Sequence, residues 1–584
     1  MAQANQGVAV GVAKDRAVWT AETDNVELLD LTIGDMFDQG AEAVPEREAV
    51  VYKYPELGMD LRLDYRSFQA EVNKLAKGII ALGIEAGDKV AVLAPNIPEW
   101  LLLEIALAKV GAVLVTVNTG YRAAELEYLL RNGDIHTLFT VDKYRKSSFI
   151  EALDGLLPEL RECRDPARDL LRTQALPRLR RVVMMRCESS YVGCLPFDQV
   201  LELGTAISDE QLRARQASVK PHDVAQIQYT SGTTGHPKGV MLTHHSTLNN
   251  ALLTARRAGL ADGERFLASM PLFHTAGCVV NVLSTLLHRG TLIMAVYFDA
   301  RKMLELIDAE KPSIINMVPT MLIAMLGDPL FQQGRFNTRS ITKMLTGGTS
   351  IPVVLIDEVH KRIGGNPMIV LGLTETSPIV CQTLPDDSFE LKSTTVGQPL
   401  PHTSVKVVDQ ETGEVLGFDQ PGELLVKGYL LMQGYYLMPE KTAETIDAQG
   451  WLHTGDLGMM DKNGYVRVIG RLKDMIIRGG ENIYPVEIEE FLLGHESVEQ
   501  AAVVAVPDEY MGEEAAAILR LAEGASLDEA VLREYCRARI SRHKVPKYFL
   551  FVDEFPLTAS GKFRKNVLRE VALQMLGLNK GEGA

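Results

Sequence analysis

The strongest constraint on the fold is an alternation of short apolar runs and helical patterns between residues 89 and 131. One apolar run, Lys89 to Pro95, ends in a turn, and a second covers Val113 to Val117. The segments that follow them, Pro98 to Gly111 and Ala123 to Arg131, space their apolar residues as a helix does. Strands that are apolar along their whole length belong to parallel sheets covered on both faces. The pattern therefore predicts an α/β fold with stacked sheets of this kind.

Length and charge limit the possibilities further. The chain has 584 residues, which at ~150 residues per domain suggests about four domain-sized units. Its 60 basic and 76 acidic residues give a net charge of −16, which argues against a nucleic-acid binder but is compatible with a locally basic nucleotide pocket. The six scattered cysteines fit neither a disulfide framework nor a zinc cluster, so we expect a cytoplasmic protein. We expect no transmembrane segment.

The character of the sequence changes near residue 400. Short strands and turns follow one another from about 400 to 470 and predict a β-rich subdomain. A smaller α+β unit begins after Gly470 and Arg471, with a helix that opens at Pro485 and a later strand at Ala502 to Val506. We expect a large N-terminal domain over 1–472 and a small mobile C-terminal domain over 473–584.

The segment 157–186 is irregular and rich in arginine. A solvated surface insertion is one interpretation of this composition. A patch that meets an acidic partner or a membrane surface is the other.

A strand over Ala225 to Tyr229 leads into a loop that combines glycines, hydroxyl side chains and one lysine. Glycines let backbone N–H groups approach an anion, hydroxyls donate further hydrogen bonds, and the lysine supplies positive charge. Pro237 separates the last glycine of the run from the lysine, so the loop is not a Walker A motif. The candidate phosphate-binding residues are Thr230, Ser231, Gly232, Thr233, Thr234, Gly235 and Lys238.

This loop resembles the signature of the adenylate-forming (AMP-binding) superfamily, which includes acyl- and aryl-CoA synthetases. The resemblance continues in family order through 271–274, 345–349, 372–375, 451–456, 470–474 and 556–562, and covers roughly residues 30–575. The segment Arg478 to Pro485 looks most like that of medium- and long-chain fatty-acyl-CoA ligases.

The resemblance implies roles in binding ATP and magnesium. Glu375 would be a Mg²⁺ ligand with help from Thr230, and Thr374 would donate to the α-phosphate. The turn at Gly347, Gly348 and Thr349 would lie beside adenine, with Leu371 and Gly372 nearby. Leu371 stands where the family usually has tyrosine or another aromatic residue, so adenine would lose a stacking contact worth about 0.5–1.5 kcal/mol.

Other roles follow from the same resemblance. Asp456 would accept hydrogen bonds from both ribose hydroxyls, and Arg471 would bind the ribose or a phosphate. Lys562 would bridge the acid's carboxylate and the α-phosphate during adenylation. His274 would orient that carboxylate.

The second half-reaction needs a different arrangement. Lys473 matches the hinge position of the family, and Gly479 and Gly480 would leave room for the pantetheine of CoA. The apolar stretches Val279 to Leu287 and Ile314 to Met325 would line an acyl tunnel or belong to the core.

The function expected from the resemblance is that of an ATP-dependent acyl-CoA ligase with Mg²⁺ as cofactor and ATP and CoA as substrates. A carboxylic acid, by resemblance a medium- or long-chain fatty acid, would become acyl-AMP with release of pyrophosphate, and CoA would then displace AMP. The alternatives are a ligase for aryl or other acids, and an acyl-AMP ligase that serves a free carrier protein. A homodimer is among the assemblies that remain open.

Overall fold

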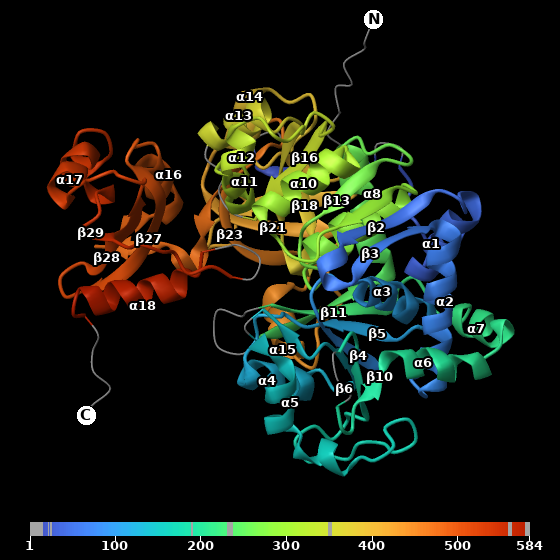
Figure 1. Cartoon of the computed structure of the whole chain (residues 1–584). Coiled ribbons are helices and arrows are strands. Elements are labelled where there is room, and N and C mark those ends of the chain that lie inside the picture. Colours follow the sequence, from blue (N-terminus) through green and yellow to red (C-terminus); the bar gives the residue numbers. More distant parts are fainter. Residues whose placement is uncertain are drawn as a thin grey trace, which may run out of the picture.

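The structure is a computed structural model of the chain that describes residues 16–21, 23, 26–145, 147–187, 191–230, 237–348, 353–479, 481–558 and 563–578. A large body contains most of these residues, and a smaller body lies to one side at the C-terminal end (Figure 1). The predicted α/β class, with a large N-terminal domain of sheets and a smaller C-terminal domain, is confirmed.

An eight-stranded sheet contains the strands expected between residues 89 and 131. In spatial order its strands are β10 (Leu195–Pro196), β9 (Arg181–Met184), β6 (Ile135–Thr140), β4 (Lys89–Leu93), β5 (Val113–Thr116), β11 (Val224–Thr230), β12 (Lys238–Thr243) and β22 (Gly434–Tyr435). The pairs from β10 to β11 are parallel, and β12 pairs antiparallel with both β11 and β22. The sheet therefore ends, on one edge, in a hairpin and a short added strand.

A nine-stranded sheet forms the second large layer. Its order is β19 (Gln398–Pro399), β18 (Ile379–Gln382), β17 (Asn366–Gly372), β16 (Lys343–Gly347), β15 (Ile314–Asn316), β13 (Arg265–Ala268), β14 (Thr291–Met294), β2 (Glu48–Tyr54) and β3 (Met59–Asp64). The strands from β17 to β2 are parallel, and the outer pairs are antiparallel.

Helices connect the parallel strands and cover the sheets. The helices of the large body are α1 (Ile33–Ala43), α2 (Tyr65–Ala81), α3 (Pro98–Val110), α4 (Ala123–Asn132), α5 (Phe149–Leu156), α6 (Phe197–Leu203), α7 (Asp209–Gln216), α8 (His244–Arg257), α9 (Ser284–Leu287), α10 (Ala300–Glu310), α11 (Pro319–Leu326), α12 (Pro329–Gln332), α13 (Val353–Arg362), α14 (Phe389–Thr394) and α15 (Pro439–Thr445). A π-helix, η4 (Ala276–Leu283), precedes α9. The helices predicted after β4 and β5 are thus α3 and α4.

The predicted β-rich region forms a five-stranded antiparallel sheet. Its order is β1 (Val18–Thr20), β20 (Thr403–Val408), β21 (Gly422–Gly428), β23 (Leu452–Met460) and β24 (Val466–Arg471). Strand β1 was not predicted from the sequence. It pairs with β20, which lies nearly 400 residues later in the chain. Trp19 of β1 packs so closely on Gly464 that a Cβ there would lie 2.3 Å from the indole.

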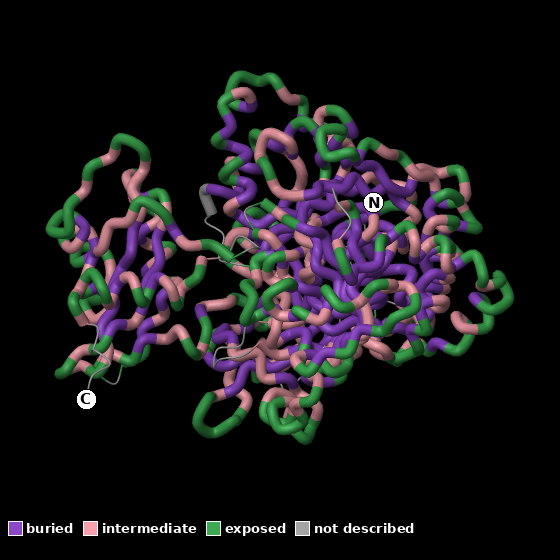
Figure 2. The backbone as a smooth tube through the Cα atoms, turned by 60° about the horizontal axis from the view of Figure 1, so that its bottom comes forward, coloured by how far each residue is buried: buried purple, intermediate pink, exposed green. Residues whose placement is uncertain are grey.

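The smaller body has its own sheet and core. The sheet contains β26 (Glu481–Ile483), β25 (Ile476–Arg478), β28 (Gly512–Leu521), β27 (Val498–Asp508) and β29 (Tyr548–Phe551), and the helices are α16 (Pro485–Leu493), α17 (Glu529–Arg537) and α18 (Lys565–Met575). Separate hydrophobic clusters lie on the two faces of this sheet. Figure 2 shows this buried interior apart from that of the large body. The predicted boundary at residues 472 and 473 stays a prediction.

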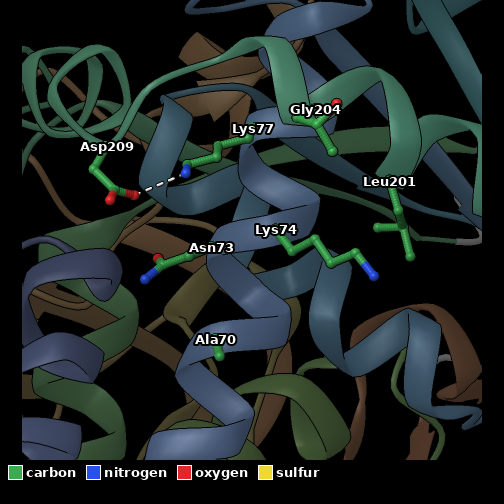
Figure 3. A pocket seen from close by; sticks show the side chains of 8 residues that line it. Ala70, Asn73, Lys74, Lys77, Leu201, Gly204 and Asp209 are labelled. Carbon is green, nitrogen blue, oxygen red and sulfur yellow. Dashed lines mark ion pairs between the residues drawn. The ribbon is translucent and has the colours of Figure 1, made fainter.

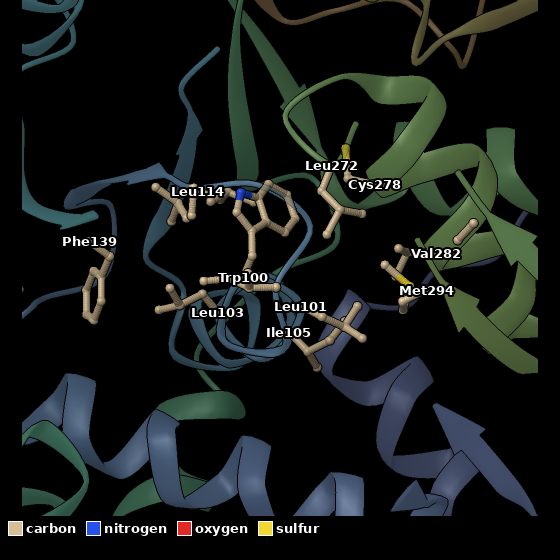
Figure 4. Packing of buried hydrophobic residues seen from close by; sticks show 14 of the residues in the cluster. Trp100, Leu101, Leu103, Ile105, Leu114, Phe139, Leu272, Cys278, Val282 and Met294 are labelled. Carbon is tan, nitrogen blue, oxygen red and sulfur yellow. The ribbon is translucent and has the colours of Figure 1, made fainter. Parts of the chain in front are cut away.

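Helix α3 lies deep in the core of the large body. Nearly all of its residues are buried, as expected for a helix that is apolar on every side. Figure 4 shows the indole of Trp100 among Leu114, Leu272 and neighbouring apolar side chains.

Glu104, on the same helix, is only 3% exposed, and neither of its carboxylate oxygens has a hydrogen-bond partner within the described residues. Burial raises the pKa of this carboxyl well above its ordinary value, so it is protonated in the folded protein.

The arginine-rich segment lies on the surface of the large body. Arg181 turns inward and donates to the carbonyl oxygens of Leu82, Pro166 and Ala167, and Arg186 pairs with Glu99 at 2.7 Å. These contacts support the interpretation as a surface insertion. Within the part of the chain that the structure describes, no helix is long and apolar enough to cross a bilayer.

We expect Glu104→Gln to raise the free energy of unfolding by an amount that grows with pH. The unfolded carboxyl ionises above about pH 4.3, whereas the folded one keeps its proton. Wild-type stability therefore falls as pH rises between the two pKa values, by up to about 1.4 kcal/mol per pH unit, and glutamine does not titrate. Urea unfolding at about pH 5 and about pH 8 measures the difference.

Glu42→Gln, an exposed side chain on α1, is the control for this measurement. Its stability relative to wild type should be the same at the two pH values. A Glu104→Gln variant with equal gains at both would contradict a buried, protonated carboxyl.

Candidate active site

The predicted phosphate loop joins two paired strands at the edge of the eight-stranded sheet. The antiparallel register of β11 and β12 puts Tyr229 opposite Gly239 and Thr230 opposite Lys238. Thr230 and Lys238 therefore lie side by side at the base of the loop. Ser231, Gly232, Thr233, Thr234 and Gly235 lie outside the described residues.

The segment 432–436 connects this hairpin to the nine-stranded sheet. Gln433 and Tyr436 donate their N–H groups to the carbonyl oxygens of Met241 and Gly239 on β12, at 2.9 and 2.7 Å. The N–H of Met432 donates to the carbonyl oxygen of Glu375 at 2.9 Å. Glu375 belongs to η5 (Thr374–Thr376), which directly follows β17. The two large sheets thus meet at this segment.

Tyr435 brings two predicted site residues together. Its hydroxyl donates to Oε1 of Glu375 at 2.9 Å, and the ammonium of Lys238 lies 4.3 Å from the centre of its ring. Burial and the nearby Glu375 charge raise the pKa of the Tyr435 hydroxyl well above its usual value, so it remains a donor at neutral pH. Within the described chain, Oε2 of Glu375 has no hydrogen-bond partner.

The composition of this cluster fits a magnesium ion held partly by substrate. Mg²⁺ prefers hard oxygen ligands and is often bound by one or two carboxylates together with phosphates. Glu375 and Thr230 offer a carboxylate and a hydroxyl oxygen. No group of three or more His, Cys, Asp or Glu side chains suited to a metal occurs among the described residues, so an all-protein metal cage is not formed there.

The predicted adenine segment lies at the carboxyl ends of neighbouring parallel strands. Gly347 on β16 is opposite Val370 on β17, and a Cβ on Gly347 would lie 2.4 Å from the Val370 carbonyl oxygen. Close strand packing thus requires the glycine. Leu371 is opposite Cys381 and packs on the hydrophobic cluster of the antiparallel sheet. Gly348 and Gly372 lie beside these residues, and Thr349 is outside the described chain.

Asp456 and Arg471 form a cross-strand pair on β23 and β24. Their register makes them direct neighbours, and Nε of Arg471 lies 3.1 Å from Oδ1 of Asp456. Glu423 on β21 supports the bulged part of β23 before Asp456, because its carboxylate accepts the Gly455 N–H at 3.2 Å and lies 3.0 Å from Nδ1 of His453. The bulge beside Asp456 is therefore held from the neighbouring strand.

His274 lies in the loop that precedes the π-helix. Its Nδ1 accepts the N–H of Ala276 at 3.2 Å. The buried Asn96 holds the loop, since its amide donates to the carbonyl oxygens of Met270 and Ala295 and accepts the N–H of Leu272.

The residues predicted for the hinge and for CoA lie at and beyond the junction of the two bodies. Lys473 belongs to η6 (Leu472–Asp474), between β24 and β25, and burial lowers its pKa. Gly479 has φ +57°, and its N–H donates to Met511 at 2.8 Å. Met511 lines an open depression of about 550 Å³ on the smaller body. Gly480 and Lys562 lie outside the described residues.

A second depression, of about 310 Å³, lies between α2 and α6 (Figure 3). Lys77 and Asp209 form an ion pair of 2.8 Å on its wall. None of the predicted site residues that the structure describes lines it. It is therefore separate from the candidate active site.

Three residues that organise the site were not predicted from the sequence: Tyr435, Glu423 and Asn96. Each acts through contacts with residues from other segments, and none stands within a motif rich in glycine or hydroxyls. Glu423 follows Gly422 at the start of a strand, a position that by itself indicates only an edge or a turn. Their roles become visible only when the partner strands are in place.

The two apolar stretches considered for an acyl tunnel are buried in the structure. Val279 to Leu287 forms most of η4 and α9, and Ile314 to Met325 forms β15 and α11. Most of their side chains belong to the hydrophobic clusters of the large body. This burial supports the core interpretation, and the tunnel stays a prediction.

Comparison with known proteins gives consistent matches along the chain. Residues 37–436 match the family described as AMP-binding enzyme, and residues 487–562 match its C-terminal domain. The putative acyl-CoA synthetase YngI of Bacillus subtilis is 41% identical over 557 residues, which cover 95% of this chain and 100% of that protein. The mitochondrial medium-chain acyl-CoA ligase ACSF2 of Mus musculus is 37% identical over 558 residues, covering 94% of this chain and 89% of that one. The crystal structure of ATP-bound MatB from Rhodopseudomonas palustris superposes with a TM-score of 0.77 at 26% identity, covering 93% of this chain and 100% of MatB.

We expect Glu423→Ala to weaken ATP binding several-fold and to lower the melting temperature. The substitution removes the acceptor of the Gly455 N–H and the partner of His453, so the bulge of β23 before Asp456 loses both of these contacts with β21. Isothermal titration with ATP, together with thermal unfolding, measures both effects. Glu411→Ala, at an exposed position on the β20–β21 turn, should change neither. Unchanged ATP affinity in Glu423→Ala would show that the contacts of Glu423 with the β23 bulge do not affect nucleotide binding.

Proposed function

The chain belongs to the AMP-binding enzyme family and is an ATP-dependent, AMP-forming acyl-CoA ligase, and we propose that its acid substrate is a medium- or long-chain fatty acid. In this reaction the carboxylate displaces pyrophosphate from ATP to give acyl-AMP. The thiol of CoA then attacks the acyl carbon, the thioester forms, and AMP leaves. The name of the ACSF2 relative supports a medium-chain acid.

The proposed site is supported by a chain of contacts: Thr230 is opposite Lys238 in the hairpin, and Tyr435 contacts both Lys238 and Glu375. A triphosphate and a carboxylate repel each other, so a site that joins them must supply positive charge and donors close together. Lys238 offers the charge, and Thr230 offers a hydroxyl at the base of the loop. Tyr435 contacts both Glu375 and Lys238 and so connects them.

We assign Glu375 and Thr230 as the protein ligands of Mg²⁺. The free carboxylate oxygen and the hydroxyl are the hard donors that this ion prefers. Bound Mg²⁺ would neutralise phosphate charge next to the incoming carboxylate. Lys238 would hold the phosphates from the opposite strand of the hairpin.

The remaining nucleotide contacts follow from the positions of the pair on β23 and β24. Asp456 would accept hydrogen bonds from the ribose hydroxyls. Arg471 would orient the Asp456 carboxylate and bind the ribose or a phosphate. Thr374 would donate to the α-phosphate. The ends of β16 and β17, with Gly347, Gly348, Thr349, Leu371 and Gly372, would flank adenine.

The C-terminal body would serve both half-reactions. Lys562 would bridge the carboxylate and the α-phosphate in the first, and Gly479 and Gly480 would admit pantetheine in the second. Lys473 is suited to a hinge because it lies in η6, the short segment that connects β24 of the large body to β25 of the smaller one. His274 would orient the carboxylate.

We also propose a reducing compartment such as the cytoplasm. All six cysteines are free thiols in the structure, and four of them are buried. Such a set of scattered thiols is typical of proteins kept under reducing conditions.

Lys562→Ala should slow adenylate formation by on the order of 10²-fold or more, because one charge-stabilising group is lost at the reacting centre. Thioester formation from presynthesised acyl-AMP should persist, since the lysine has no role in that step. Pyrophosphate exchange measures the first half-reaction, and CoA-dependent AMP release measures the second. Equal damage to both would contradict the division of labour.

The identity of the acid is tested by AMP release with straight-chain acids of graded length and with benzoate. If the chain is buried in an apolar site, each added methylene should raise kcat/KM about fourfold until the site is filled, from about 0.8 kcal/mol per methylene. Highest activity with benzoate would favour an aryl-CoA ligase. Acyl-AMP formation without transfer to CoA, but with transfer to a purified carrier protein, would favour an acyl-AMP ligase.

A further inference from the structure

Tyr435 is the one described side chain in contact with both Glu375 and Lys238. Its hydroxyl donates to Oε1 of Glu375 at 2.9 Å, and its ring carries the Lys238 ammonium at 4.3 Å from the centroid. The two charged residues come from segments 137 positions apart in the chain. In the described structure each of them contacts Tyr435, and no direct ion pair between the two is among the described contacts.

The backbone around Tyr435 holds its side chain in place. Strand β22 pairs with β12 so that Tyr435 is opposite Val240. The Tyr435 N–H donates to Oγ1 of Thr442 at 2.9 Å, and that hydroxyl in turn donates to the Met438 carbonyl oxygen. The side chain is only 4% exposed. A side chain tied in this way has little freedom to leave Glu375.

This arrangement keeps two opposite charges apart. A lysine and a glutamate that contact the same tyrosine are oppositely charged neighbours, and a direct ion pair between them would have to break before either met a ligand. Among the described residues the hydroxyl occupies only one carboxylate oxygen of Glu375, which leaves Oε2 for a cation. The ring attracts the ammonium weakly, and a phosphate displaces such a contact easily because its charge interacts more strongly.

We propose that Tyr435 is a positioning residue that holds Glu375 ready for a divalent cation and Lys238 ready for phosphate by keeping the two from pairing. The inference rests on the proposed function, because it takes Glu375 as the cation ligand. It adds a residue that touches neither the nucleotide nor the metal.

The neighbouring residue provides a matched control. The Tyr436 hydroxyl also donates to a carboxylate, Oδ2 of Asp134 at 3.0 Å, and its ring also lies under an ammonium, that of Lys89 at 5.1 Å. None of these partners belongs to the proposed site. Tyr436→Phe therefore removes the same atom from the same kind of contact one residue away.

The test is Mn²⁺ affinity, measured by electron paramagnetic resonance with the full-length protein and a non-hydrolysable ATP analogue. Tyr435→Phe should bind Mn²⁺ about tenfold more weakly, as expected when a hydrogen bond to a charged group is lost. It keeps the ring, so metal-free binding of the analogue should change less than about twofold. The Mg²⁺ concentration for half-maximal adenylation should rise by a similar factor, with kcat recovered at saturating Mg²⁺.

Two further variants separate the outcomes. Glu375→Gln should weaken Mn²⁺ binding more than Tyr435→Phe does, and Tyr436→Phe should leave it unchanged. Thr442→Val, which removes the acceptor of the Tyr435 N–H, should weaken it in the same direction and replaces Tyr435→Phe if that variant does not fold.

Unchanged Mn²⁺ affinity in Tyr435→Phe, with a clear loss in Glu375→Gln, overturns the role of Tyr435 and leaves the proposed function intact. Unchanged affinity in Glu375→Gln overturns the metal assignment itself, and the inference with it. An equal loss in Tyr436→Phe also overturns the inference, because the effect would then not depend on Glu375.

Discussion

Backbone hydrogen bonds along residues 432–436 join the two large sheets where the phosphate loop begins. The segment pairs with β12 of the eight-stranded sheet. The N–H of Met432 donates to the carbonyl oxygen of Glu375 in η5, which follows β17 of the nine-stranded sheet. Tyr435 continues the same link through its side chain to Glu375 and Lys238. Strand β22 carries the Tyr435 side chain that contacts both Glu375 and Lys238, so the relative position of these two charged residues depends on this strand.

The rest of the molecule serves this meeting point. The parallel strands β16 and β17 end on a common edge, and η5, which follows β17, contacts β12 of the hairpin. The antiparallel sheet adds Asp456 and Arg471 as a cross-strand pair braced by Glu423. The chain runs from β24 through η6 to β25 of the smaller body, whose helix α16 packs on β24. Arg471, at the end of β24, therefore lies close to the chain segment that connects the two bodies.

Buried polar groups have two different consequences in this protein. Asn96 donates both amide N–H bonds and accepts one through its amide oxygen, and these bonds hold the loop before His274, so its polarity organises structure. Glu104 has no partner within the described residues and retains its proton instead, so its polarity costs stability. The difference is one of partners rather than depth, because both side chains are almost wholly buried.

Periodicity and local motifs by themselves determined the α/β class, the helices and strands between residues 89 and 131 and the β-rich region, because those features depend on residues close in sequence. Tertiary structure alone decided that β1 joins the distant antiparallel sheet, that Leu371 packs on that sheet's cluster, and that Tyr435 lies between Glu375 and Lys238. Each of these depends on one strand finding a partner up to nearly 400 residues away. A tyrosine in a short, largely apolar stretch does not indicate such a partner, since a hydrogen bond or ring contact needs only the right position in space.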